Sequence, residues 1–147
     1  MDDIYNSRIL ELAGNIERSG TLEDADASSE KHSKLCGSKV RVYLKVDNGI
    51  VTDFAHQVRA CALGQAASSV MARHVVGATA AEIRQARDEM LAMLKQDGEG
   101  PTGRFDEMRV LKPVKDYKAR HASTMLTFDA VVDCLDQIDA RSPAMAS

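Results

Sequence analysis

The sequence predicts an α+β fold in which a small antiparallel sheet, built on one hairpin, packs against several helices. Apolar and polar residues alternate from Val40 to Val46, which is the pattern of a half-buried strand. An Asn48-Gly49 pair follows, and such a pair tolerates the positive φ angles that a tight hairpin turn requires. Helical periodicity lies before and after this hairpin, and such segregation indicates α+β rather than α/β architecture.

The first half of the chain is predicted to hold one helix and the hairpin. Residues 4–18 carry apolar residues at helical spacing, and Gly20 is expected to end that helix. Residues 21–35 are small and polar without a period, so we expect a loop or an irregular edge there. The return strand of the hairpin is expected over residues 50–58. Its inward-facing residues are expected to be Phe54, His56 and Val58.

The middle of the chain is predicted to form two helices. Residues 62–76 are rich in alanine and other apolar residues, and Gly77 is expected to stop this first helix. Thr79 and Glu82 have the spacing of a capping box, in which each side chain bonds the backbone N–H of the other residue. The second helix is therefore expected over about residues 80–96.

The last third is predicted to end in a long helix. Residues 96–103 are rich in glycine and acidic residues and indicate a flexible loop, whereas residues 105–114 carry apolar residues without an assignable period. A helix is expected over 119–139. We therefore expect one domain over residues 1–140, followed by a flexible tail over 141–147.

Composition excludes several functional classes. The 147 residues include 44% hydrophobic and 28% charged residues, with a net charge of −3, which is too small and mixed to predict a nucleic-acid or membrane partner. No apolar run approaches the roughly 18 residues that a membrane span requires. The acidic N-terminus lacks the features of a secretory signal, so we expect a cytoplasmic protein with reduced thiols.

Three cysteines, an odd number, argue against a disulfide framework. Cys134 accompanies the apolar stripe of the last helix and is expected to be packing. Cys36 precedes the first strand and Cys61 follows the second, so the hairpin would bring these two together at its open end. Cys61 also precedes a helix, and a helix N-terminus favours the thiolate, which is both nucleophile and metal ligand.

Three segments carry a resemblance to a known family. The first contains Cys36-Gly37-Ser38, the second contains Cys61 before an alanine- and serine-rich helix, and the third runs from Arg120 to Ser123. With these segments, the chain resembles the NifU/IscU/SufU family of iron–sulfur cluster assembly scaffolds over roughly residues 4–137. The resemblance implies an IscU/NifU N-terminal-like fold. It also implies a role without turnover chemistry of its own, with a cysteine desulfurase and apo iron–sulfur proteins as partners.

The chain departs from the family at several ligand positions. Ser38 stands where the family has aspartate, and Ser123 stands where it has its third cysteine. The histidine that precedes that cysteine in the IscU branch is replaced by Ala122, with His121 one position earlier. Cys36 and Cys61 remain as metal ligands or as acceptors of persulfide sulfur.

The ligand set leaves several alternatives open. Two thiolates per chain could hold a [2Fe–2S] cluster across a homodimer, or a zinc ion with help from His121, or neither. Ser38 and Ser123 would be weak ligands or hydrogen-bond donors to sulfur. Arg120 would either pair with a carboxylate inside the domain or face an anionic partner.

Three functional hypotheses follow from these alternatives. The first is a scaffold or carrier that binds iron, cluster or persulfide sulfur through Cys36 and Cys61. The second is a paralogue without a cluster, which acts as a binding or regulatory module. The third is a zinc-binding, SufU-like sulfur acceptor.

Overall fold

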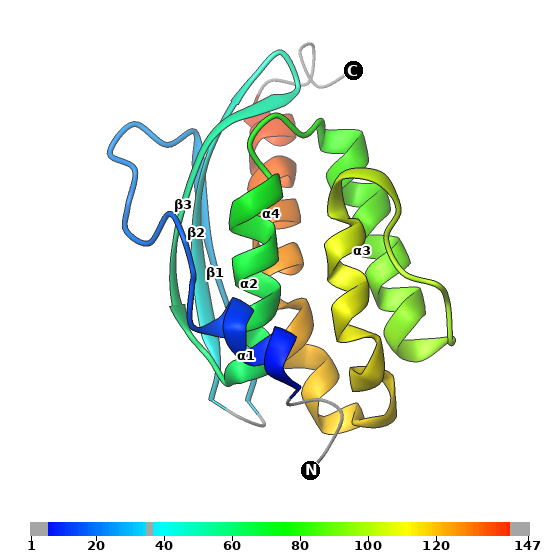
Figure 1. Ribbon diagram of the computed structural model, residues 1–147. Helices are drawn as coiled ribbons and strands as arrows, with labels where there is room; N and C mark the ends of the chain where they lie inside the picture. The colour runs from blue at the N-terminus through cyan, green and yellow to red at the C-terminus, as the bar shows by residue number, and fades with distance from the viewer. Residues whose placement is uncertain (1–5, 35–36, 142–147) are drawn as a thin grey trace.

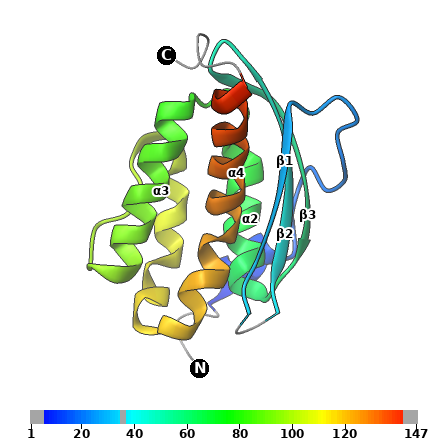
Figure 2. The ribbon, with the colours of Figure 1, turned by 180° about the vertical axis from the view of Figure 1, so that it is seen from behind.

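The computed structural model describes residues 6–34 and 37–141, and its architecture confirms the predicted α+β class. A three-stranded antiparallel sheet forms one layer, helices α2 and α4 form the next, and α3 lies with η2 on the far side (Figures 1 and 2). The elements in chain order are α1 (Ser7–Ala13), β1 (Ala27–His32), β2 (Lys39–Asp47), β3 (Ile50–Arg59), α2 (Ala62–His74), α3 (Ala80–Lys95), η2 (Gly103–Asp116), η3 (Lys118–Arg120) and α4 (His121–Arg141).

The hairpin forms β2 and β3 as predicted. Asn48 and Gly49 make its turn with φ angles of 53° and 76°, which are the left-handed values that such a turn requires. Val42 of β2 pairs with His56 of β3, and Leu44 pairs with Phe54. These residues are buried against the helices, so one face of the sheet forms part of the core.

Strand β1 corrects the expected loop over residues 21–35. Ala27 pairs with Leu44 and His32 pairs with Lys39, so β1 is an edge strand beside β2. Its buried positions are held by Ala27 and Ser29, which are small. The strand therefore lacks the large apolar residues at alternating positions by which a strand is predicted from sequence.

Helix α1 is shorter than the expected helix over residues 4–18. It ends at Ala13, with Gly14 as its C-cap. The following backbone turns back toward the sheet, where Gly20 N–H donates to the His56 carbonyl and His56 N–H donates to the Arg18 carbonyl. These bonds to β3 replace further helical turns, and Arg18 adopts a positive φ of 59° to make them.

The segment over residues 105–114, which the sequence left unassigned, lies within η2. Buried Phe105, Met108, Leu111 and Val114 are spaced by three residues, which matches the three-residue turn of a 3-10 helix. This segment also contains Glu107, which accepts from His74 of α2 at 2.9 Å and thereby fixes η2 to the helix layer.

The turn of the hairpin is clamped to the connection between α2 and α3. Val51 N–H donates to the Ala78 carbonyl, Gly77 N–H donates to the Val51 carbonyl, and Ala80 N–H donates to the Gly49 carbonyl, at 2.8–3.0 Å. The predicted capping box of Thr79 begins α3 at the same place and is confirmed. The sheet is thus fixed to the helices at the end where the hairpin turns.

Helix α4 begins at His121 and extends to Arg141, two residues beyond the predicted end at 139. The other residues of the predicted tail, 142–147, lie outside the described part of the chain. Within residues 6–34 and 37–141, none of the helices combines the length and apolar character that crossing a membrane requires.

Candidate functional site

Cys61 occupies the N-cap position of α2, where strand β3 has just ended. Its backbone is extended, with φ −66° and ψ 170°, and its side chain makes no capping hydrogen bond. The thiol is half-buried, and no acidic residue lies in the first turn of α2. The positive end of the helix dipole therefore lies at a half-buried sulfur.

Ser38 reaches this site from the residue before β2. The Cys61 backbone N–H donates to Ser38 Oγ at 3.4 Å, and Ser38 is only 2% exposed. This hydroxyl therefore ties the start of β2 to the start of α2. It is one of the two serines that stand at family ligand positions.

Ser123 reaches the same sulfur from the first turn of α4. Its Oγ lies 3.2 Å from Cys61 Sγ, and the side chain is 1% exposed. The segments of Ser38, Cys61 and Ser123, which are far apart in sequence, thus meet at one end of the molecule. In Figure 1 this is the lower end, where both α2 and α4 begin.

Gly64 allows the two helices to approach each other closely at the site. A Cβ atom at this position would lie 2.9 Å from Ala60 Cβ and 3.2 Å from the Ser123 carbonyl oxygen. Both separations are shorter than ordinary van der Waals contact. The absence of a side chain at Gly64 is therefore what brings Ser123 within hydrogen-bonding distance of Cys61.

Of the other two cysteines, the structure describes Cys134 but not Cys36. Cys134 is fully buried on α4, as predicted, and burial raises the pKa of its thiol to about 12. A thiol with such a pKa remains protonated and unreactive at neutral pH. Cys36 lies outside the described residues, although its neighbour Ser38 contacts Cys61.

His121, considered above as a possible zinc ligand, is buried at the start of α4. It is 3% exposed, and its Nε2 lies 3.0 Å from the carbonyl oxygens of both Val114 and Lys115. Its Nδ1 lies 3.2 Å from Lys95 Nζ. Both ring nitrogens thus have partners inside the protein, where His121 joins η2 and α3 to the start of α4.

Of the two alternatives for Arg120, an ion pair with a carboxylate inside the domain is not found among the described residues. Arg120 is half-buried, and its carbonyl oxygen accepts from Thr124 Oγ1 at 2.8 Å within α4.

The described donors at the site do not by themselves make up a closed metal centre. Among the described residues no three His, Cys, Asp or Glu side chains are grouped in a way that could hold a metal ion. Cys61 is accompanied by the hydroxyls of Ser38 and Ser123, and neutral hydroxyls are poor ligands for zinc or iron compared with thiolates. The tetrahedral zinc site of the third hypothesis is therefore not formed by these residues.

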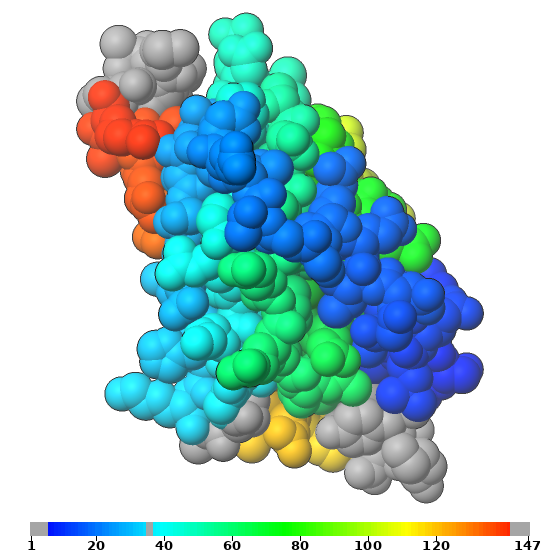
Figure 3. All heavy atoms as spheres, turned by 90° about the vertical axis from the view of Figure 1, so that its left-hand side faces the viewer, coloured from blue at the N-terminus to red at the C-terminus, as the bar shows by residue number. Residues whose placement is uncertain are grey.

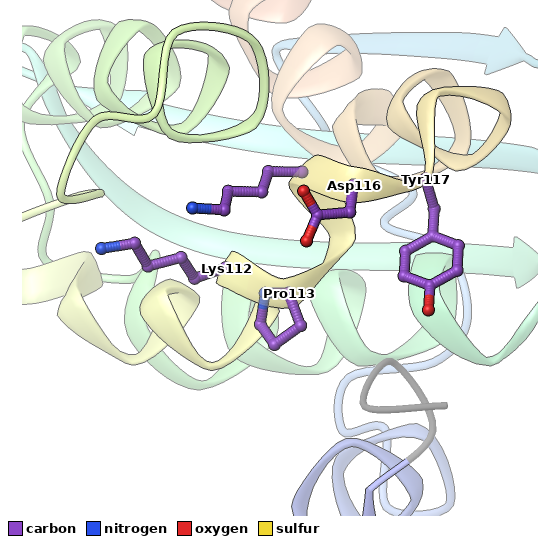
Figure 4. A pocket seen from close by; sticks show the side chains of 5 residues that line it. Lys112, Pro113, Asp116 and Tyr117 are labelled. Carbon is purple, nitrogen blue, oxygen red and sulfur yellow. The ribbon is translucent and has the colours of Figure 1, made fainter. Parts of the chain in front are cut away.

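Two of the hollows on the described surface lie outside this site and bear on the charges around it. One, of about 290 Å³, is lined by residues 112–117, and Figure 4 shows the Lys112 and Tyr117 side chains pointing in different directions around it. Lys112 pairs with Glu99 and Lys115 pairs with Asp97, so the lysine charges around this hollow are compensated.

The second hollow, of about 420 Å³, lies on the sheet beside Ser38 and was not predicted from the sequence. Its lining residues are Glu30, His32, Ser33, Lys34, Gly37, Lys39 and Arg59.

The fold and site together define a small α+β scaffold domain with an accessible thiol where a sheet and two helix N-termini meet. The family model of the NifU-like N-terminal domain matches residues 4–124. The chain therefore belongs to that family.

Solved structures and curated relatives agree with this assignment. A crystal structure of a nitrogen-fixing NifU-like protein (N-terminal) from Brucella abortus is 66% identical, with a TM-score of 0.94, over 95% of this chain and 97% of the other. The iron–sulfur cluster assembly scaffold protein IscU of Thermotoga maritima is 28% identical over 92% of this chain and 94% of its own length. The zinc-dependent sulfurtransferase SufU of Bacillus subtilis is 23% identical over 89% and 88% of the two chains.

Proposed function

We propose that this protein is a scaffold and sulfur carrier of iron–sulfur cluster assembly, which receives sulfur as a persulfide on Cys61. The observation that supports this most is the half-buried Cys61 thiol at the start of α2, with the Ser123 hydroxyl 3.2 Å from its sulfur. The family membership and the similarity to the iron–sulfur cluster assembly scaffold protein IscU of Thermotoga maritima support the same role. Cys36 is proposed as the second thiol.

The proposed loading step is a thiol exchange. The Cys61 thiolate attacks the terminal sulfur of a persulfide on the donor, a new S–S bond forms on Cys61, and the donor's S–S bond breaks. The donor leaves as a thiolate, so the step consumes no oxidant or reductant. We propose a cysteine desulfurase as donor and apo iron–sulfur proteins as recipients of the finished cargo.

The two serines are proposed to position the reacting sulfur. Ser123 Oγ can donate a hydrogen bond to the thiolate, which stabilises the negative charge and orients the sulfur lone pairs. Ser38 Oγ accepts from the Cys61 backbone N–H and holds the end of β3 in place. In this proposal neither serine is a metal ligand.

The cluster is cargo rather than a resident cofactor in this proposal. The sequence offers Cys36 and Cys61 as thiols at the site, whereas a [2Fe–2S] cluster is normally held by four thiolates. A cluster would therefore be shared between two copies of the chain, as a homodimer. The proposal also requires a compartment that keeps thiols reduced, such as the cytosol.

Persulfide loading tests the proposal directly. The protein is incubated anaerobically with a small uncharged persulfide, and each cysteine peptide is mapped by mass spectrometry. We expect one added sulfur atom on Cys61, no loading in Cys61→Ala, and normal loading in the matched control Cys134→Ala. Absence of sulfur on Cys61 in the unaltered protein would contradict the proposal.

A cluster-free binding module is the second candidate, and the hydroxyls beside Cys61 favour it over a zinc site. Iron and acid-labile sulfide are measured after anaerobic purification. Matching amounts of iron and sulfide support the scaffold, whereas a metal-free protein that also fails to load sulfur supports the binding module. Ser123→Cys should tighten metal binding, because it places a second thiol next to Cys61.

A further inference from the structure

Two cationic side chains and a histidine form a row across the outer face of the sheet, at the end that carries Cys61. Lys39 of β2 pairs directly with His32 of β1 on one side and with Arg59 of β3 on the other. All three side chains are exposed. We call His32, Lys39 and Arg59 the basic row.

Charges elsewhere on this face are compensated. In the next row Arg41 lies 3.4 Å from Glu30, and toward the hairpin turn Lys45 lies 3.2 Å from Asp24. By contrast, no member of the basic row pairs with a carboxylate of the described residues. Like charges directly opposite each other destabilise a sheet, so the fold itself gains nothing from this arrangement.

The basic row borders the hollow of about 420 Å³ beside Ser38. Lys34 adds a third cationic side chain to its lining, and the single acidic lining residue, Glu30, is already paired with Arg41. Ser33 also lines the hollow, and its buried hydroxyl has no hydrogen-bond partner within the described residues. The hollow therefore offers net positive charge to a ligand with carboxylate groups.

The basic row is open and adjoins the site. Lys39 follows Ser38 directly, and Arg59 lies two residues before Cys61. Figure 3 looks onto the outer face of the sheet, where the segment between α1 and β1 covers the half toward the hairpin turn and leaves the opposite end uncovered. A partner that docks on this uncovered end would reach Cys61 without crossing the rest of the molecule.

We propose that the basic row and Lys34 form the docking surface for an acidic, Asp- and Glu-rich segment of the protein that donates sulfur to Cys61. This inference rests on the proposed function for the reaction that follows docking, but the surface itself is defined by charge. Attraction between an acidic segment and the row would guide the donor's persulfide toward Cys61 and accelerate the encounter.

The test uses two synthetic peptides that each carry a cysteine as a mixed disulfide with pyridine-2-thiol. One peptide is rich in glutamate, and the other has glutamine at the same positions. The Cys61 thiolate attacks the peptide sulfur, the mixed disulfide breaks, and the released pyridine-2-thiolate reports the rate. Mass mapping restricts the measurement to Cys61. At low salt we expect the glutamate peptide to react roughly tenfold faster than the glutamine peptide. This ratio of rates should fall as the salt concentration rises.

Lys39→Glu is the decisive variant, and Lys45→Glu is its matched control at the other end of the same face. Lys39→Glu should remove most of the glutamate peptide's advantage, whereas Lys45→Glu should leave it intact. Because the new carboxylate would lie between His32 and Arg59, Lys39→Glu should also raise Tm. A raised Tm would show that the variant folds, so that a lost preference for the glutamate peptide is not caused by misfolding. Equal rates for the two peptides, or equal effects of the two variants, would overturn the docking surface.

The same variant separates this inference from the proposed function. If Lys39→Glu still takes up sulfur from a small uncharged persulfide while losing its preference for the acidic peptide, both proposals hold. If Cys61 accepts sulfur but the protein never prefers the acidic peptide, only the docking surface fails. If Cys61 accepts no sulfur from the small persulfide, the proposed function fails, whatever the peptide rates are.

Discussion

Cys61 and Cys134 lie in the same helix layer but in opposite environments. Cys61 is half-buried at the positive end of α2, next to the hydroxyl of Ser123. Cys134 is fully buried in the middle of α4, with its sulfur 3.9 Å from the Val42 carbonyl oxygen, and its thiol pKa is raised to about 12. The comparison shows that position in the fold, rather than residue type, decides which thiol is accessible and which is kept protonated by burial.

The same substitution at both cysteines should have opposite effects on stability. Cys134→Ser buries a hydroxyl in an apolar environment and should lower the free energy of unfolding by about 1–3 kcal/mol. Cys61→Ser places a good N-cap at a helix start that has no side-chain cap, and should raise it by about 0.5–1 kcal/mol. Urea unfolding measures the change in the free energy of unfolding for both variants. If both changes had the same sign, the inferred contrast between the two cysteine environments would be wrong.

Gly64→Ala tests whether close packing of α2 on α4 creates the site. The added methyl would lie 2.9 Å from Ala60 Cβ, so we expect a loss of about 1–3 kcal/mol in the free energy of unfolding, together with slower sulfur loading on Cys61. Gly14→Ala is the control, since its nearest atom would lie at 3.5 Å and its φ is −84°. A stable Gly64→Ala with normal loading would show that the helices tolerate wider separation.

Acidic pH should lower the free energy of unfolding, because His56 is buried in its neutral form. Burial lowers the pKa of this histidine below its usual 6.5, partly offset by its Nε2–H bond to the Glu17 carbonyl, and its Nδ1 has no partner within the described residues. As pH falls, the unfolded chain therefore takes up the proton first. The stability that neutral His56 contributes is complete above about pH 6.5 and is lost as pH falls toward the lowered pKa of the folded state.

Urea unfolding between about pH 7.5 and pH 5.5 measures this loss. His56→Gln keeps a donor for the Glu17 carbonyl but cannot ionise, so its stability should vary less over this range. If the variant and the unaltered protein lose stability in parallel, another group is responsible for the acid dependence.

Ser123→Ala should have the smallest effect. Loss of the hydroxyl 3.2 Å from Cys61 Sγ should slow sulfur loading by about three- to tenfold, in line with the loss of one hydrogen bond. Ser68→Ala is the matched control, because Ser68 is also buried and its hydroxyl has no partner within the described residues. The prediction is wrong if the two variants load at the same rate.

Strong local signals made the hairpin and the middle helices predictable. The alternation before Asn48-Gly49 and the capping box of Thr79 each specify a structure within a few residues, and both are confirmed. Strand β1 was missed because its buried positions hold small residues, which pack against α4 through tertiary contacts that no short window reveals.

The part of the site that follows from the hairpin topology could be predicted from the sequence. A hairpin brings its two ends together, which predicted that Cys36 would lie near Cys61. Cys36 lies outside the described residues, but Ser38, two residues further on, does contact the Cys61 backbone. The burial of His121 depends on carbonyl oxygens of η2 and on Lys95 of α3, and the sequence offered no sign that these would meet. The basic row depends on strand register, including the pairing of Lys39 with a strand that the sequence did not predict.

The clamp at the hairpin turn has a consequence for native-state hydrogen exchange. The amides of Val51, Gly77 and Ala80 bond across the boundary between the sheet and the helix layer. None of them can be released by fraying of a single element, because each donor and its acceptor belong to different segments. We therefore expect these three amides to exchange together and slowly, as one cooperative unit at the end of the molecule opposite the thiol.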